Sequence, residues 1–171
     1  MESIVELLSG GDLRSIGKSN QVISLIHTQK DFDQIFNRLF DEDRLMVMRC
    51  ADAIEKITRI NRAYLAKHKT AIIKLGETAK NKELKWHLAL LIPRLQLTAP
   101  ELRSVWKLLY DWAADKINSR IVRVNAISAL FELTKQDREL TNSFYGLITA
   151  VEKEKIPSIN ARIKSISKEI T

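Results

Sequence analysis

The stretch VRVNAISAL, residues 122–130, contains Ala126, one of four small or aliphatic residues that recur at a nearly constant interval. The others are Ala51, Ala89 and Ile163, and successive members lie 38, 37 and 37 residues apart. A second apolar set keeps the same interval, with separations of 37, 37 and 38 residues: Ile35, Ile72, Leu109 and Leu147. Two sets in one register predict an internal repeat in which each unit contributes two elements.

Each repeat is predicted to be a pair of amphipathic helices. Apolar residues recur as i, i+4, i+7 and i+11, which is typical of an α-helix. Strand-length alternation of polar and apolar residues is missing, as are Asn-Gly and Asp-Gly dipeptides, so the sequence predicts an all-α fold. First helices are expected near 31–40, 63–79, 99–114 and 138–152, and second helices near 44–60, 82–95, 119–135 and 157–170.

Asp43, Asn81 and Asn118 each precede a second-helix anchor by eight residues. A short Asx side chain at such a position can accept hydrogen bonds from the unpaired amides that begin a helix, so each is predicted to be an N-cap. The fourth pair carries Lys155 in this register, and its second helix is expected to begin at Pro157 or Ser158 instead.

Further helix boundaries follow from Pro and Gly. The segment TAPE at 98–101 is a capping box, which predicts that a helix begins there. Pro93 cannot donate a hydrogen bond to the carbonyl of Ala89, so the helix over 82–95 should kink or stop at Ile92. The pair Gly10-Gly11 is expected to form a turn after an N-terminal apolar helix.

The period, the paired helices and VRVNAISAL resemble the HEAT-repeat (armadillo-like) family, whose second helices carry a VRxxAxxAL pattern. The resemblance covers residues 31–171 and implies a right-handed α-α superhelix, a HEAT-like solenoid of about four helix pairs plus N-terminal helices. The segment LLSGGDLRSIG at 7–17 is also similar to the start of small stand-alone bacterial HEAT-like proteins of unassigned activity. We expect one HEAT-like domain over 1–171, divided into an N-terminal helical cap and four helix pairs: 1–30, 31–60, 63–95, 98–135 and 137–170.

Composition places the chain among globular proteins. Its 171 residues are 45% hydrophobic and 29% charged, which fits one domain. No apolar run reaches the roughly 18 residues of a membrane span, and residues 1–6 lack the basic start of a secretory signal. A single cysteine, Cys50, cannot form an internal disulfide, so we expect a reducing, cytoplasmic location.

Motifs for catalysis and metal binding are missing from the sequence. His27, His68 and His87 have no metal-ligand spacing, and His68 lies on an apolar stripe, where it is expected to be a core or boundary residue. Gly10-Gly11 is not followed by the GK[ST] of a phosphate-binding loop, and neither GxSxG nor HExxH occurs. We expect no metal, no cofactor, no small-molecule substrate and no enzymatic activity, although scattered residues can also form an active site.

Positive charge is concentrated in the predicted second helices. They hold 13 Lys and Arg against five Asp and Glu, a net charge of +8 in a chain whose total is +7. The second helices of HEAT-like proteins line the concave face, so the resemblance implies a basic concave face that would attract acidic partners. Cations also stabilise helix C-termini, which is an alternative, structural interpretation of the same bias. The candidate partner-binding residues are Arg49, Lys56, Arg59, Lys82, Lys85, Trp86, Arg120, Arg123 and Arg162.

The sequence favours a noncatalytic adaptor or scaffold that binds an acidic protein surface or peptide, without membrane contact. Nucleic acid is the alternative partner, because Trp86 lies beside two lysines and exposed aromatic rings can stack on bases. A HEAT-like alkylpurine DNA glycosylase is a precedent in fold, and Trp112 and Asp115 are the nearest candidates for its aromatic and carboxylate set. Trp106 shares an apolar stripe, where aromatic residues usually fill the core.

Overall fold

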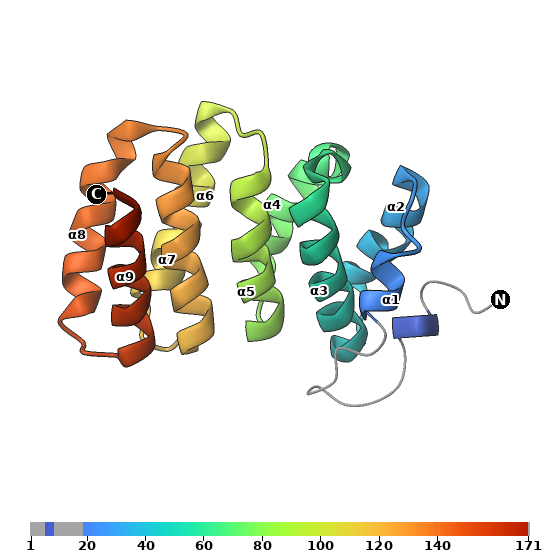
Figure 1. The fold of residues 1–171 in the computed structure, drawn as a ribbon, viewed down its shortest axis with the longest axis horizontal. Coiled ribbons are helices and arrows are strands. Elements are labelled where there is room, and N and C mark those ends of the chain that lie inside the picture. Colours follow the sequence, from blue (N-terminus) through green and yellow to red (C-terminus); the bar gives the residue numbers. More distant parts are fainter. Residues whose placement is uncertain (1–5, 9–18, 171) are drawn as a thin grey trace. The chain divides into compact units, whose positions relative to one another are not determined.

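The computed structural model describes residues 6–8 and 19–170, and no strand occurs among them, which confirms the all-α prediction (Figure 1). The α-helices are α1 (Ser19–Ile23), α2 (Gln29–Asn37), α3 (Arg44–Ile60), α4 (Lys69–Thr78), α5 (Lys82–Leu91), α6 (Ala99–Ala114), α7 (Arg120–Thr134), α8 (Thr141–Glu152) and α9 (Pro157–Ile170). Single turns or short runs of 3-10 helix are η1 (Glu6–Leu8), η2 (Arg38–Phe40), η3 (Arg62–His68), η4 (Ile92–Arg94) and η5 (Arg138–Leu140). None of these helices is long and apolar enough to cross a membrane.

Most predicted helix boundaries are confirmed, but the helix predicted over 63–79 is α-helical only in α4, and residues 62–68 form the 3-10 run η3. The ranges 44–60, 99–114 and 157–170 coincide with α3, α6 and α9. The helix over 82–95 stops being α-helical at Leu91, and Pro93 lies in the 3-10 turn that follows, as its missing amide requires. The predicted turn at Gly10-Gly11 lies outside the described residues, as does most of the segment 7–17.

Some of the predicted N-caps form side-chain hydrogen bonds and others do not. Asp43 begins α3, where its Oδ1 accepts from the amides of Leu45 at 2.9 Å and Met46 at 3.4 Å. The capping-box carboxylate of Glu101 accepts from the Thr98 amide at 2.7 Å. Asn81 occupies the N-cap position of α5 without a side-chain cap bond.

The cap predicted at Asn118 is wrong. The N-cap residue of α7 is Ser119. The Asn118 side chain binds elsewhere, because its Nδ2 donates to the carbonyl of Trp112 at 3.3 Å and its Oδ1 accepts from Lys85 Nζ at 3.1 Å. Tertiary contacts have replaced the local cap.

The chain divides into two compact units, Met1–Thr70 and Ala71–Thr171. In the N-terminal unit α1, α2, η2 and η3 pack against α3. Phe32, Phe36 and Ile54 are fully or almost fully buried there, as aromatic and branched residues on the inner stripes of α2 and α3 should be. The single domain predicted over 1–171 stays a prediction.

In the C-terminal unit α5, α7 and α9 form one layer, while α6 and α8 form a second (Figure 1). The central helix is α7, which packs against α5, α6, α8 and α9. Its inner stripe of Val122, Ala126, Ile127 and Leu130 is completely buried, so tandem helix pairs close on α7 as the repeat predicts.

Ala126 supplies a test of this packing. Its exposed fraction is 0%, so Ala126→Glu would bury a charge without a partner and should lower the free energy of unfolding by several kcal/mol, on the order of a small domain's whole stability. Lys107→Glu removes only an exposed pair with Asp111 and should cost less than about 1 kcal/mol. Urea unfolding compares the two, and equal losses would contradict the assigned helix faces.

Candidate functional site

The loops that precede α5, α7 and α9 lie at the same end of their helices. These helices are neighbours in one layer, and Figure 1 shows their first turns together at the bottom of the C-terminal unit. We call this surface the loop edge and define it as residues 80–85, 115–121 and 153–155. It contains seven Lys and Arg and three Asp and Glu.

One contact fixes the middle loop to α5. Lys85 Nζ donates to Asn118 Oδ1 at 3.1 Å and lies 5.6 Å from the centroid of the buried Trp112 ring. Asn118 in turn donates to the carbonyl of Trp112 at the end of α6. Because a cation above a tryptophan face is attracted by the ring, both contacts hold the loop 115–119 against α5.

A second contact, which we call the Arg123 clamp, fixes the last loop to α7. Arg123 is only 2% exposed. Its Nε donates to the carbonyl of Ala113 at 2.8 Å, and its Nη1 and Nη2 each donate to the carboxylate of Glu154 at 2.9 Å. The side-chain hydrogen bond from Arg123 lowers the pKa of Glu154, and the positive charge of Arg123 acts in the same direction. The clamp therefore joins the end of α6, the first turns of α7 and the loop before α9.

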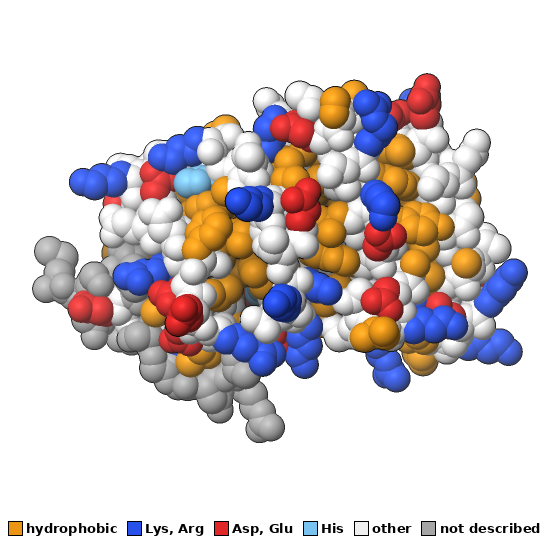
Figure 2. Space-filling view, turned by 180° about the vertical axis from the view of Figure 1, so that it is seen from behind, with side chains coloured by type: hydrophobic (Ala, Val, Ile, Leu, Met, Phe, Trp, Pro, Cys, Tyr) orange, Lys and Arg blue, Asp and Glu red, His pale blue; other side chains and the backbone are white. Residues whose placement is uncertain are grey.

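Cations and aliphatic side chains project from the edge that these contacts hold. Ile117 is 94% exposed and Ile121 is 47% exposed, and both belong to the middle segment of the edge. On the right-hand side of Figure 2, which is the C-terminal unit seen from behind, Lys and Arg side chains protrude along the lower rim. The exposed cations of the loop edge are Lys80, Lys82, Lys116, Arg120, Lys153 and Lys155.

A family model for the HEAT repeat domain matches residues 7–170. The chain belongs to the HEAT repeat family. Neither a search of curated proteins nor a search of solved structures found a match. The predicted family and the all-helical tandem architecture are therefore confirmed.

Four of the nine predicted partner-binding residues gather on or beside the loop edge of this HEAT repeat protein. Lys82 and Arg120 are exposed and have no ion-pair partner among the described residues, whereas Lys85 and Trp86 are partly buried. Arg162 lies on α9, outside the loop edge, and is also partly buried.

Two predicted partner-binding residues are corrected by their burial. Arg49 is 0% exposed, and its Nη1 donates to the carbonyl of Leu8 at 2.8 Å. Arg123 is the centre of the clamp. Neither guanidinium can reach a partner, because both are held by internal acceptors. A guanidinium in the core needs such partners to offset its lost hydration.

Lys56 and Arg59 belong to the N-terminal unit and form local ion pairs. Lys56 Nζ lies 2.7 Å from Asp52, and Arg59 Nη2 lies 2.8 Å from Glu55, in each case one helical turn away. Such pairs support the helix α3. Their charge is partly balanced, which makes them weaker candidates than Lys82 and Arg120.

The aromatic residues are mostly core, as the apolar stripe predicts. Trp106 and Trp112 are buried. Trp86 is partly buried, and its ring centroid lies 3.5 Å from that of His87. Asp115, the candidate carboxylate predicted together with Trp112, accepts from the amide of Ile117 at 2.9 Å in the loop. This arrangement does not form a row of exposed rings on which bases could stack.

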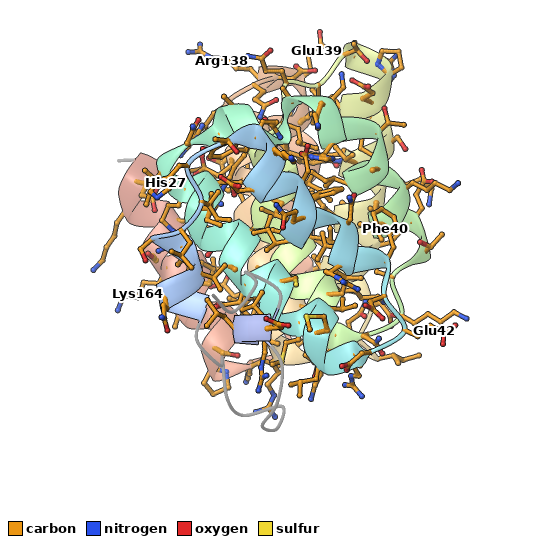
Figure 3. The ribbon with its side chains drawn as sticks, turned by 90° about the vertical axis from the view of Figure 1, so that its right-hand side faces the viewer. His27, Phe40, Glu42, Arg138, Glu139 and Lys164 are labelled. Carbon is orange, nitrogen blue, oxygen red and sulfur yellow. The ribbon has the colours of Figure 1, made fainter. Side chains whose placement is uncertain are left out.

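The histidines do not form a metal site, and no cluster of metal-ligating side chains occurs among the residues that the structure describes. His68 is buried. Its Nε2 donates a 2.7 Å hydrogen bond to Asp33 Oδ1, and its ring stacks on that of Phe36 with the centroids 3.7 Å apart. The predicted core role of His68 is confirmed. His87 is buried, and His27 lies at the surface (Figure 3).

Sequence reasoning missed the loop residues of the edge. Lys80, Lys116, Lys153 and Lys155 fall between the predicted helices and were outside a charge count limited to second helices. The repeat register could have identified these loops as neighbours, because Asn81, Asn118 and Lys155 occupy equivalent positions in successive repeats. Equivalent loops of a stacked repeat must lie on one edge.

The Arg123 clamp predicts a pH effect. The pKa of Glu154 is lowered in the fold, so its ionised form stabilises the protein fully above the usual value of 4.5 and loses this contribution as the pH falls through the folded value. Glu154→Gln should cost roughly 1–3 kcal/mol at pH 7, and the difference from wild type should shrink toward pH 3.

Urea unfolding at pH 7 and pH 3.5 measures this difference. Asp111→Asn is the matched control, because Asp111 pairs with Lys107 at the exposed surface of α6 and its loss should have little effect at either pH. A Glu154→Gln variant as stable as wild type at pH 7 would contradict the clamp.

Proposed function

We propose that this HEAT repeat protein is a noncatalytic adaptor that binds an acidic protein surface or acidic peptide through the loop edge. The observation that carries the proposal is Ile117, an isoleucine that is 94% exposed in a segment flanked by Lys116 and Arg120. A central apolar contact surrounded by cations is the composition expected of a surface that docks an acidic segment with one apolar side chain.

The distribution of charge supports this surface over the rest of the chain. Residues 71–171 contain 17 Lys and Arg and 11 Asp and Glu, so they hold +6 of the chain's net charge of +7. The proposed contact lies at the N-terminal edge of the second helices and not along their length, because Arg123 is buried and the loop lysines are exposed. Positive helix N-termini beneath the loops add to the attraction for carboxylates.

Cys50 supports two parts of the proposal, which are the lack of a cysteine nucleophile and the cytoplasmic location. Burial raises the pKa of the Cys50 thiol to about 12, so the only cysteine of the chain stays protonated and is a poor nucleophile at neutral pH. A single buried thiol also suits a reducing compartment.

A designed peptide tests the surface. The probe is a fluorescein-labelled peptide of eight acidic residues with one central Leu, and its partner probe has Ser in place of Leu. The double variant Lys82→Glu, Arg120→Glu should weaken binding of both peptides about tenfold, because it removes two unpaired cations and introduces repulsion. Arg103→Glu combined with Lys74→Glu is the matched control, since both residues are exposed and lie outside the loop edge.

Ile117→Ser separates the apolar contact from charge. It should weaken the Leu peptide about fivefold, which corresponds to roughly 1 kcal/mol of partial side-chain burial. The Ser peptide should be unaffected. Fluorescence anisotropy gives all the affinities, and equal losses from the edge variant and the control variant would remove the loop edge as the binding surface.

Nucleic acid is the alternative, and the same instrument decides it. Labelled single- and double-stranded oligonucleotides should bind more weakly than the Leu peptide at 150 mM salt. If duplex DNA binds more tightly, and its log affinity falls with log salt by about 0.9 per neutralised phosphate, the nucleic-acid alternative replaces the adaptor.

A further inference from the structure

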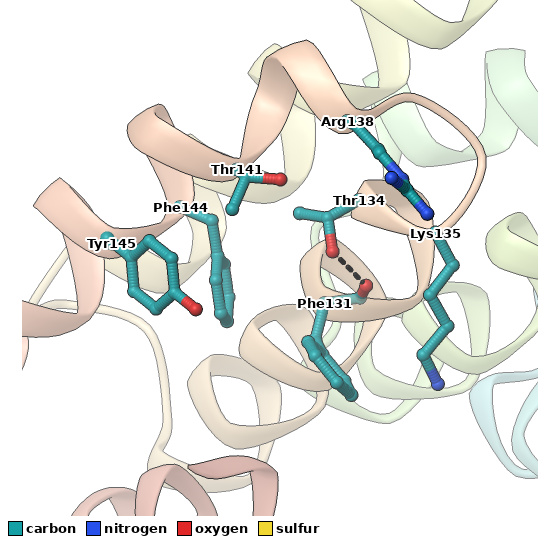
Figure 4. A pocket seen from close by; sticks show the side chains of 7 residues that line it. All are labelled: Phe131, Thr134, Lys135, Arg138, Thr141, Phe144 and Tyr145. Carbon is teal, nitrogen blue, oxygen red and sulfur yellow. Dashed lines mark hydrogen bonds between the residues drawn. The ribbon is translucent and has the colours of Figure 1, made fainter. Parts of the chain in front are cut away.

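An open hollow of about 370 Å³ lies between the last turn of α7, η5 and the start of α8 (Figure 4). It is at the C-terminal end of α7, whereas the loop edge is at the N-terminal end. Its size falls within the range of small-ligand pockets. The hollow is lined by Phe131, Thr134, Lys135, Arg138, Thr141, Phe144 and Tyr145.

Aromatic rings form one wall of the hollow. Phe131 and Phe144 are buried, and their ring centroids lie 6.0 Å apart. Tyr145 follows at 6.2 Å from Phe144 and is 41% exposed, so part of its ring faces solvent. In Figure 4 these rings point into the space between α7 and α8. Such a wall offers an edge-to-face or stacked contact to another flat ring.

The two cations of the hollow differ in how far they are neutralised. Lys135 Nζ lies 2.6 Å from Glu132, 3.8 Å from Glu169 and 4.5 Å from the Phe131 ring centroid. Arg138 is exposed, projects from the surface in Figure 3, and has no ion-pair partner among the described residues. Arg138 therefore supplies the uncompensated positive charge.

One free hydroxyl, that of Thr141, lies on the Arg138 side of the hollow in Figure 4, whereas Tyr145 lies farther from Arg138, beyond Phe144. Thr134 Oγ1 is engaged, because it donates to the carbonyl of Phe131 at 2.7 Å. The hydroxyls of Thr141 and Tyr145 form no hydrogen bond with the described residues, and Figure 4 shows both on the side of α8 that faces the hollow. One guanidinium and one nearby hydroxyl, with the ring of Tyr145 farther along the hollow, match a carboxylate joined to a ring.

We infer that the hollow binds an aromatic carboxylate, with its ring against the exposed Tyr145 and its carboxylate on Arg138. The planar guanidinium fork fits the two oxygens of a carboxylate in one plane. A free aromatic acid and the C-terminal phenylalanine of a peptide share this chemistry. The inference is independent of the loop edge, and its failure would leave the proposed function untouched.

Four probes test the inference by titration of the ¹⁵N-labelled protein in NMR. They are 3-phenylpropionate, its amide, an acetylated Gly-Ser octapeptide that ends in a free Phe carboxylate, and the same peptide amidated. Each carboxylate should bind about tenfold more tightly than its amide, as expected for a hydrogen bond to a charged group, and should shift amides of η5 and α8. Tighter binding of the peptide than of 3-phenylpropionate assigns the site to chain termini, and equal or weaker binding assigns it to free acids.

Two variants locate the contacts. Arg138→Gln should abolish the preference for carboxylate over amide, whereas Tyr145→Ala should weaken acid and amide to the same extent. Arg103→Gln, an exposed residue of α6 outside the hollow, should change neither affinity. Equal affinity of acid and amide for the wild-type protein, or an unchanged preference in Arg138→Gln, would overturn the inference.

Discussion

The arrangement of the C-terminal unit depends on one buried guanidinium. Arg123 leaves water almost completely, and the cost of that transfer is offset only because all three of its donor groups find acceptors. Those acceptors belong to Ala113 at the end of α6 and Glu154 in the loop before α9. Two segments that are far apart in the chain are thereby held against the first turns of α7, which is itself the central helix of the unit.

The clamp also decides which charges face solvent. It withdraws Arg123 and Glu154 from the surface as a matched pair, while Lys116, Arg120 and Lys153 stay exposed around it. The positive loop edge therefore results from geometry as well as from the excess of basic residues. Ile117 remains outside the core because the loop 115–119 is tied down through Asn118 and Asp115, which leaves the side chain between them in solvent.

The repeat register was sufficient to predict the helices but only part of the surface. The buried Ala126 and the Asp43 cap follow from spacing and local hydrogen bonding, which act within one or two turns. Arg123 and Arg49 could not be placed in this way, because Glu154 and Leu8, which accept from them, lie 31 and 41 residues away in sequence. The cap predicted at Asn118 was wrong for the same reason, since Lys85, which is 33 residues away in sequence, binds its side chain. Partners that are distant in sequence determine whether a polar side chain is buried and what it binds, whereas the spacing of apolar residues determines the fold.

We propose that geometry imposed by the clamp, rather than net charge, makes the loop edge a binding surface. Arg123→Lys tests this most directly, because it keeps the charge but cannot reproduce the three hydrogen bonds of the guanidinium. The measurement is the affinity of the folded variant for an acidic peptide with one central Leu, with folding verified by NMR. We expect at least fivefold weaker binding, although Arg123 itself cannot touch the peptide. An affinity within twofold of wild type would contradict it.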